Sequence, residues 1–476
     1  MSRLPSDPAL WTAADTLRAY RDRTLSPVEA TQAALKRIAM LNGAVNAYCL
    51  IDAEGALAAA RAAEARWAKG APLSSFDGIT ASVKELMLAK GWPTRRCSKL
   101  TSPEGTWDEN APAVARLREG GAVLLGKTTS PEIGWKGVTD SPLFGITRNP
   151  WDTRMTPGGS SGGAAVAAAL GMGTLHLGTD GGGSIRMPAG FTGIFGLKPT
   201  YGLVPVYPLS TFGTLSHAGP MTRTVGDAAL MLDIIAQRDA RDWHQLPPTA
   251  LDFGAGLDSD LKGVRIAYSP TMGYARVSPE VRALTDKAAQ AFAEMGATVV
   301  PVEHVCEDPR EIFIKLWTAG CALAAHYLPR ARRHEMDPGL QSFIVQGEAI
   351  PHMDYLEAEY ERGKLGGRME AFFGTYDLLL TPSLPMTAFP ATQQVADPAT
   401  QRHWIDWTPF TYPFNMTRQP AASVPCGFAP NGLPVGIQIA GPLHADRLIV
   451  RAAHAFEQRH PFRMPETVND TAAHAS

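Results

Sequence analysis

Two glycine- and serine-rich segments, separated by a run of small residues, restrict the folding of this chain more than any other feature. The first reads Thr156-Pro-Gly-Gly-Ser-Ser-Gly-Gly and the second Gly178-Thr-Asp-Gly-Gly-Gly-Ser-Ile-Arg-Met-Pro, so that Ser160 and Ser184 stand 24 residues apart. Glycine runs let backbone amides approach a ligand closely and adopt positive φ, which an anion or oxyanion site requires. One such loop could be a flexible connection, but two that bracket a helix and each present a serine favour a functional site.

The rest of the chain predicts an α/β fold. From residue 76 onward, short apolar runs alternate with helical stretches, which is typical of a large sheet covered by helices on both faces. The predicted strands are residues 79–83, 122–125, 174–178, 193–197, 264–268, 298–302, 376–380, 422–425 and 433–439. The predicted helices in this part of the chain are residues 112–119, 163–170 and 225–236.

Residues 9–68 are predicted to be helical, with Ser26-Pro27 as a cap followed by proline at the first helical position. We therefore expect a helical segment over residues 1–70, packed on an α/β domain over residues 71–470 to form one large domain. Residues 247–261 are polar and rich in Gly and Pro, as a linker would be. We interpret them as a surface excursion, because the later strands still need sheet partners.

Composition excludes several classes of protein. The 44 basic and 46 acidic residues are well mixed, so neither a nucleic-acid nor a membrane partner is indicated. The five cysteines are far apart and never spaced as C-x-x-C, which favours reduced core thiols over disulfides or a zinc site. Residues 1–11 lack the continuous apolar stretch of a signal peptide, and no apolar run is long enough to span a membrane. We expect a cytoplasmic protein that needs no cofactor and no metal.

One motif resembles a phosphate-binding loop. Gly121-Ala-Val-Leu-Leu-Gly-Lys-Thr128 matches G-x-x-x-x-G-K-[ST] letter for letter. A phosphate-binding loop follows a strand and keeps its middle residues free to wrap phosphate, whereas residues 122–125 are themselves the apolar strand. We therefore reject nucleotide binding.

A second motif resembles the nucleophile elbow of α/β hydrolases, G-x-S-x-G, at Gly158-Gly-Ser-Ser-Gly162. That elbow needs a buried strand immediately before it, and Thr153-Arg-Met-Thr-Pro offers no apolar run. None of the downstream histidines stands in a context that marks a catalytic base. This match is also rejected.

The two loops together resemble the amidase signature family, whose defining stretch pairs G-G-S-S-G-G with G-x-D-x-G-G-S-I-R-x-P. These motifs appear here as residues 158–163 and 178–188, and Asp77-Gly-Ile-Thr-Ala-Ser-Val-Lys84-Glu is similar to the lysine-bearing strand of the family. Further similar segments are residues 91–94, 122–128, 193–200, 219–223 and 432–441, so the resemblance covers about residues 10–460. It implies the amidase signature fold, a large, mixed and twisted β-sheet with helices on both faces.

The resemblance also implies a catalytic triad. Ser184 is the expected nucleophile, Ser160 the bridging serine that follows a cis peptide bond from Gly159, and Lys84 the general base. A serine hydroxyl needs a group to take its proton, and a lysine can do so only when burial or nearby positive charge lowers its pKa. Lys84 follows an apolar strand, where such a shift is expected, although position alone would equally suit a lysine that reaches solvent.

The second loop is expected to form an oxyanion hole, whose donors are each worth roughly 3 kcal/mol of barrier. The four backbone amides expected to form it are those of Gly181, Gly182, Gly183 and Ser184. By resemblance, Asp180 and Arg186 pair to hold the loop rigid without touching substrate, and Ser161 and Thr179 are expected to support the triad as donors. Two departures from the family pattern, His176 and Glu85, are interpreted as a tolerated core histidine and a replacement for aspartate.

The expected substrate is a small carboxylic amide. Trp135, Tyr207 and Phe212 and the aromatic cluster Trp404, Trp407, Phe410, Tyr412 and Phe414 favour an apolar or aryl amide if they line the pocket, although core packing explains aromatic residues equally well. Esters, anilides and carbamates present the same carbonyl geometry.

An alternative function is the glutaminase subunit of a tRNA-dependent amidotransferase, which would act with a partner protein. Where the pocket of that glutaminase typically offers an aspartate to the substrate amine, this chain has Thr408. A binding protein without catalysis is disfavoured, because all three catalytic positions are intact. The sequence leaves a homodimer open.

Overall fold

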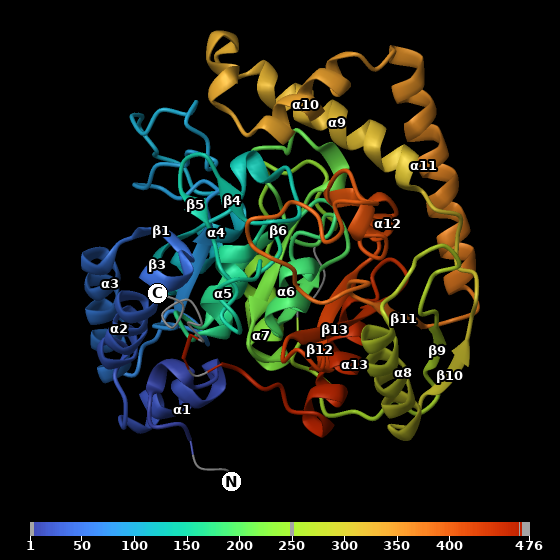
Figure 1. Ribbon diagram of the computed structural model, residues 1–476. Coiled ribbons are helices and arrows are strands. Elements are labelled where there is room, and N and C mark those ends of the chain that lie inside the picture. Colours follow the sequence, from blue (N-terminus) through green and yellow to red (C-terminus); the bar gives the residue numbers. More distant parts are fainter. Residues whose placement is uncertain (1–3, 248–251, 466, 469–476) are drawn as a thin grey trace.

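The computed structural model describes residues 4–247, 252–465 and 467–468. It contains an 11-stranded mixed sheet with the strand order β1-β3-β2-β6-β8-β7-β12-β13-β11-β9-β10 (Figure 1). The strands are β1 Tyr48–Ile51, β2 Thr80–Lys84, β3 Val123–Thr128, β6 Leu175–Asp180, β7 Phe195–Lys198, β8 His217–Thr222, β9 Arg265–Tyr268, β10 Thr298–Pro301, β11 Leu378–Pro382, β12 Ala421–Phe428 and β13 Pro434–Ala440, with β4 Asp140–Ser141 and β5 Gly145–Ile146 in a separate hairpin.

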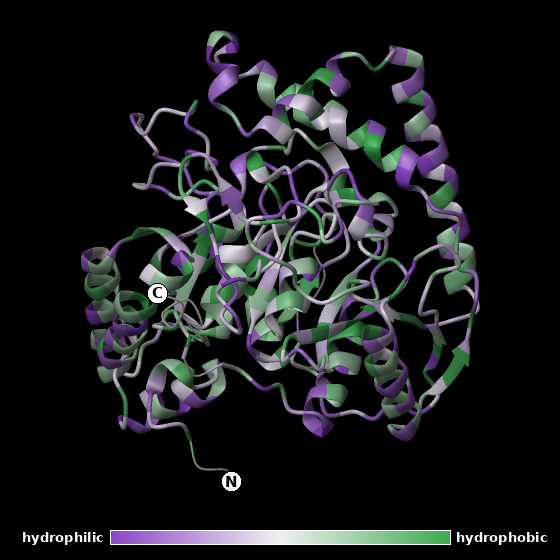
Figure 2. Ribbon diagram, viewed as in Figure 1, coloured by the Kyte–Doolittle hydropathy of each residue, from purple (hydrophilic) through white to green (hydrophobic). Residues whose placement is uncertain are grey.

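Helices cover both faces of this sheet, as predicted. The α-helices of the described residues are α1 Ala13–Asp22, α2 Pro27–Val45, α3 Ala53–Ala68, α4 Pro112–Glu119, α5 Gly162–Ala169, α6 Arg186–Thr192, α7 Val225–Ile235, α8 Pro279–Glu294, α9 Arg310–His326, α10 Pro338–Glu348, α11 His352–Phe373, α12 Tyr412–Met416 and α13 Asp446–Arg459. On β12, Ala422 and Val424 pack in one hydrophobic cluster with α7, α8 and α13, whereas Ala421 packs in another with α9 and α11. Figure 2 shows hydrophilic residues on outer helices such as α3 and α11.

The order of the chain around the sheet brings the serine loops and the lysine strand together. β2 runs parallel to both β3 and β6, with Val83 opposite Leu177. The carboxyl ends of parallel strands meet at the same edge of a sheet. Lys84 at the end of β2 and the second glycine loop after β6 therefore lie at one edge. Helix α5, which begins at Gly162 and packs on β6, brings the first loop there as well.

Most predicted elements are confirmed within a few residues. The cap at Ser26 is confirmed in detail: Ser26 Oγ accepts from the Glu29 N–H (3.2 Å) and the Glu29 carboxylate accepts from the Ser26 N–H (2.8 Å), a capping box worth roughly 1 kcal/mol. The prediction that residues 9–68 are helical was wrong at Tyr48–Ile51. Asn46 in the left-handed region ends α2, and the apolar run after it becomes edge strand β1, antiparallel to β3.

The sequence analysis also left some segments without a predicted structure. Residues 310–373 were left unassigned and form α9, α10 and α11, drawn at the top and right of Figure 1. Of residues 247–261, residues 248–251 lie outside the described residues; the segment leads into β9, which pairs with β11 in the same sheet. All five cysteines are free thiols. Within the described ranges, no helix is long and apolar enough to cross a membrane.

Candidate active site

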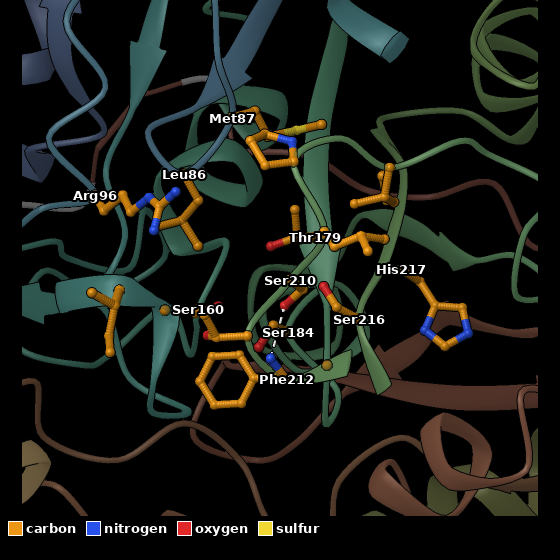
Figure 3. A pocket seen from close by; sticks show the side chains of 18 of the residues that line it. Leu86, Met87, Arg96, Ser160, Thr179, Ser184, Ser210, Phe212, Ser216 and His217 are labelled. Carbon is orange, nitrogen blue, oxygen red and sulfur yellow. Dashed lines mark hydrogen bonds between the residues drawn. The ribbon is translucent and has the colours of Figure 1, made fainter. Parts of the chain in front are cut away.

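The structure brings the three predicted catalytic residues to one place. Lys84 Nζ lies 2.7 Å from Ser160 Oγ, and Ser160 and Ser184 line the same cavity (Figure 3). Lys84 is fully buried, and the two serines are 2% and 4% exposed. The described contacts include no hydrogen bond between the two serine hydroxyls. Catalytic hydrogen bonds in a site without substrate are often long and tighten when substrate binds.

Lys84 Nζ has two further oxygen neighbours, Ser161 Oγ at 2.8 Å and Thr179 Oγ1 at 2.9 Å. The Ser161 hydroxyl donates to the Thr179 carbonyl (3.0 Å), so it must accept from Lys84. A neutral amine has two N–H groups and one lone pair. Donation to Ser161 and Thr179 therefore leaves the lone pair for Ser160, whereas an ammonium can donate to all three hydroxyls. The same geometry accommodates both protonation states.

Burial decides the protonation state of this lysine. Taking the ammonium out of water disfavours the charged form, and only weaker attraction from Cys97 and Asp180 opposes that effect, so the pKa of Lys84 falls from 10.5 to about 7. A substantial fraction of Lys84 is then neutral near neutral pH. The expectation of a depressed pKa is confirmed, and solvent contact of the side chain is ruled out.

The first serine loop depends on close backbone packing. The Gly159–Ser160 peptide bond is cis, as the resemblance implied. A Cβ on Gly159 would lie 2.8 Å from the carbonyl group of Val138, closer than real Cβ atoms approach, so a larger residue cannot stand there without a shift. The Ser161 N–H donates to the Ser184 carbonyl (3.0 Å), which ties the first loop to the second.

A buried ion pair holds the second loop. Arg186 Nη2 lies 3.0 Å from Asp180 Oδ1 and both side chains are fully buried, as the resemblance implied. Burial alone would raise the pKa of Asp180, but attraction and hydrogen bonds from Arg186, Lys198 and Asn415 outweigh it and hold the pKa well below its usual range. Neither Asp180 nor Arg186 is among the residues that line the cavity.

The same ion pair corrects one part of the predicted oxyanion hole. The Gly183 N–H donates to Asp180 Oδ1 (2.7 Å), because Asp180 caps the turn of its own loop. That amide is already engaged. The N–H groups of Gly181, Gly182 and Ser184 donate to no group in the described part of the chain. Glycine at position 181 also serves packing, because a Cβ there would lie 2.9 Å from the Trp317 ring.

The sequence analysis did not find the other partners of Arg186. This guanidinium donates to the Thr411 carbonyl (2.9 Å), Gln438 Oε1 (2.8 Å) and Asn415 Oδ1 (2.6 Å). A buried guanidinium has five N–H donors and needs acceptors for them. That requirement can be read from the sequence, but the positions of acceptors more than 200 residues away cannot.

The cavity beside the two serines has a volume of about 120 Å³. Its apolar wall comes largely from the segment after β2, the η2 turn Glu132–Gly134, the loop before β8, and α9. The apolar and aromatic residues that define it include Leu86, Met87, Ile133, Tyr207, Phe212 and Trp317. The sequence analysis missed Trp317, which stands in a helix with no motif to mark it.

The aromatic cluster at residues 404–414 does not line this cavity. Its five members are 0 to 3% exposed and pack in the hydrophobic core, with Trp407 stacked on Phe191. Of the other three predicted aromatics, Tyr207 and Phe212 line the cavity, whereas Trp135 is buried beside it. Core packing therefore explains most of these residues.

The two departures from the family pattern have structural roles. His176 is fully buried on β6, with Nδ1 2.7 Å from Ser82 Oγ and Nε2 3.1 Å from the Gly173 carbonyl, and burial lowers its pKa to about 4. It is a neutral core histidine, as interpreted. Glu85 pairs with Lys127 (2.8 Å). Residues 123–128 form β3, which confirms that the apparent phosphate loop is a strand. Its lysine, Lys127, is engaged by Glu85.

Comparisons with known proteins show which family this chain belongs to. A family model described as Amidase matches residues 29–450. The chain is 35% identical to an acylamidase of Rhodococcus erythropolis, covering 95% of this chain and 96% of that protein. It is also 35% identical to a glutamyl-tRNA(Gln) amidotransferase subunit of Chloroflexus aggregans, covering 91% and 93%. Among solved structures, a bacterial aryl acylamidase of the amidase signature family superposes with a TM-score of 0.88 at 29% identity, covering 95% and 96%.

The chain is therefore a hydrolase that acts on amide C–N bonds. It belongs to the amidase signature family.

Proposed function

We propose that this enzyme cleaves small carboxylic amides through Ser184, Ser160 and Lys84, with an acyl-enzyme intermediate. The observation that carries the proposal is the contact of 2.7 Å between Lys84 Nζ and Ser160 Oγ, in a setting that brings the pKa of Lys84 to about 7. A base with a pKa near the working pH balances availability against proton affinity.

In the first half-reaction, Ser184 Oγ attacks the carbonyl carbon as its proton passes to Ser160 and the Ser160 proton passes to Lys84. The negative charge that develops on the carbonyl oxygen is stabilised by the N–H groups of Gly181, Gly182 and Ser184. Lys84 then returns the proton through Ser160 to the amide nitrogen, the C–N bond breaks, and ammonia or an amine leaves. Ser184 now carries the acyl group as an ester.

In the second half-reaction, water attacks the ester carbonyl and gives its proton through Ser160 to Lys84. The tetrahedral intermediate collapses, the carboxylic acid leaves, and the proton returns to Ser184. Because the contacts of Lys84 suit both the amine and the ammonium, neither transfer requires the side chain to move.

The proposed acyl or aryl group of the substrate is apolar. Support comes from Phe212 and Trp317 in the cavity wall, whose rings stack with centroids 4.0 Å apart, and from the similarity to an acylamidase and an aryl acylamidase. The five free thiols support a reducing location, the cytoplasm.

The test is hydrolysis of a panel of aryl and aliphatic amides by the wild type and by Ser184→Ala, together with labelling by a fluorophosphonate probe. We expect amide turnover and labelling of Ser184 in the wild type, and neither in the variant. Equal activity of the two proteins, or a wild type that is inert and unlabelled at Ser184, would remove the proposal.

The second candidate function is the glutaminase of a tRNA-dependent amidotransferase, favoured by the similarity to several subunits of such enzymes. Glutamine carries an ammonium group that such a pocket has to bind. Thr408 is buried and donates to the Ile405 carbonyl, and the described residues that line the cavity include no Asp or Glu. We therefore favour the free-standing amidase; co-purification with a partner protein, together with glutamine-dependent ammonia release, would reverse that preference.

A further inference from the structure

One cationic side chain stands in the wall of the catalytic cavity. Arg96 lies in the segment that follows β2, and the Ile133 N–H donates to its carbonyl (2.7 Å), which fixes its backbone against another wall segment. In Figure 3 its guanidinium extends beside Leu86 toward the interior of the pocket, on the same side of the view as Ser160. Its side chain is therefore within the space that a bound substrate would share.

The guanidinium of Arg96 has no counter-ion among the residues that the structure describes. Within the described part of the chain, no carboxylate forms an ion pair with it and no acceptor takes a hydrogen bond from it. Arg96 is an exposed residue, so its guanidinium can also contact water, whereas the buried cations Lys127, Lys136 and Arg186 are each paired with a carboxylate. Partial burial lowers the pKa of Arg96, and no nearby acid opposes that effect. An arginine stays charged even so.

The charges that line the cavity have one sign. Arg96 is the only Arg or Lys among the described lining residues, and these include no Asp or Glu. Because the only formal charge among these residues is positive, the described lining favours an anionic ligand over a cationic one, to an extent that solvent around the exposed guanidinium reduces.

The backbone at this position does not favour arginine. Arg96 has φ +52° and Cys97 has φ +53°, both in the left-handed region that glycine adopts most readily. A residue held in this region at an active site commonly reflects a functional constraint.

We propose that Arg96 binds an anionic group of the substrate, so that the preferred substrates are amides that carry a carboxylate in addition to an apolar or aryl body. This inference rests on the proposed amidase function and specifies its substrate class. Arginine presents a planar fork of donors that matches both oxygens of a carboxylate. The apolar neighbours Leu86 and Ile133 would contact the carbon chain between the carboxylate and the scissile amide.

The test compares matched pairs of substrates that differ in one carboxylate. On the acyl side, the pair is N-succinyl-4-nitroanilide and N-butanoyl-4-nitroanilide; on the amine side, it is 4-acetamidobenzoate and 4-methylacetanilide. In each pair a methyl group replaces the carboxylate. The readout is the ratio of kcat/KM for the anionic amide to kcat/KM for the neutral amide. The pair that shows a ratio well above one identifies the side of the amide that faces Arg96.

We expect Arg96→Gln to lower that ratio about 10- to 100-fold, because a hydrogen bond to a charged group is lost. Most of the change should appear in KM, since the contact is made in ground state and transition state alike. Arg96→Lys should restore part of the preference. The matched control is Arg95→Gln, which removes a positive charge from the adjacent residue. The Arg95 side chain donates to the Thr101 carbonyl and does not line the cavity, so this variant should leave the ratio within about twofold.

The outcomes separate this inference from the proposed function. If the wild type hydrolyses neutral amides in a Ser184-dependent way but prefers no anionic partner, or if Arg96→Gln leaves the ratio unchanged, the role of Arg96 is refuted and the amidase proposal stands. If the wild type hydrolyses neither member of either pair and the fluorophosphonate probe does not label Ser184, both are refuted; if Ser184 is labelled but neither pair is hydrolysed, only the inference about Arg96 is refuted. An equal loss in Arg95→Gln and Arg96→Gln would also overturn the inference, because it would reveal a general charge effect.

Discussion

Lys84→Met should separate the stability of this fold from its activity. Lys84 has a pKa of about 7 in the folded protein against 10.5 without the protein environment, so between these pH values the unfolded chain binds one more proton than the folded chain. Stability then rises with pH across that interval. The shift implies a cost to folding of about 4 kcal/mol at pH 7 and about 2 kcal/mol at pH 9.

Methionine removes this cost at every pH. It also leaves the hydroxyls of Ser160, Ser161 and Thr179 without their hydrogen bonds to the amine, which destabilises the folded state by about 1 kcal/mol or more for each hydroxyl at every pH. The informative quantity is therefore the difference in the free energy of unfolding between the wild type and Lys84→Met. Measured by urea denaturation, it should rise by about 2 kcal/mol from pH 7 to pH 9 in favour of the wild type.

Lys287→Met, at an exposed position on α8, is the control and should keep the pH dependence of the wild type. The variant at position 84 should also lose nearly all amide turnover, while kcat/KM of the wild type rises with pH through about 7 as Lys84 becomes neutral. A difference in unfolding free energy that stays constant or falls between pH 7 and pH 9 would refute the reasoning, because Lys84 would then carry the same charge in both states.

Three further changes test other parts of the site. Ser160→Ala should lower kcat about 10²- to 10⁴-fold with little loss of thermal stability, because the proton path is broken; retention of a tenth of the rate would point to direct transfer from Ser184 to Lys84. Asp180→Asn leaves the buried charge of Arg186 unpaired and should cost about 3 to 5 kcal/mol in urea denaturation at pH 7, and an effect under 1 kcal/mol would contradict the assigned role of the pair. Trp317→Ala should raise KM for aryl amides more than for acetamide, and equal effects on both would show that the ring does not contact the aryl group.

The position of the three proposed catalytic residues could be predicted from the sequence because each stands in a long local motif. Lys84 ends an apolar strand, and Ser160 and Ser184 lie between glycines, so local rules place all three at one sheet edge once the strands are parallel. Local rules gave the wrong result for the Gly183 amide. Four consecutive amides in a glycine loop look equivalent in a sequence, and only the structure directs one of them to Asp180.

The pocket was less predictable than the catalytic groups. Trp404 and Tyr412 lie in a conspicuous aromatic run but are buried by α9, whose own Trp317 reaches the cavity. Which face of an aromatic segment turns toward the substrate depends on how it packs against a segment about 100 residues away in the sequence. The local periodicity of a sequence does not report contacts between such distant segments. Arg96 escaped notice because no motif marks it, and the sequence does not show that its loop lines the cavity.

The partners of Arg186 have a consequence for the synthesis of this protein. Lys84, Ser160 and Ser184, the proposed catalytic residues, all precede the residues that accept hydrogen bonds from the Arg186 guanidinium. These acceptors are Thr411, Asn415 and Gln438, the last of them on β13. A nascent chain that lacks these residues would have to bury an arginine with unsatisfied donors or leave the loop open. We therefore expect a chain that ends before β13 to carry the proposed catalytic residues without all the acceptors that hold the second serine loop.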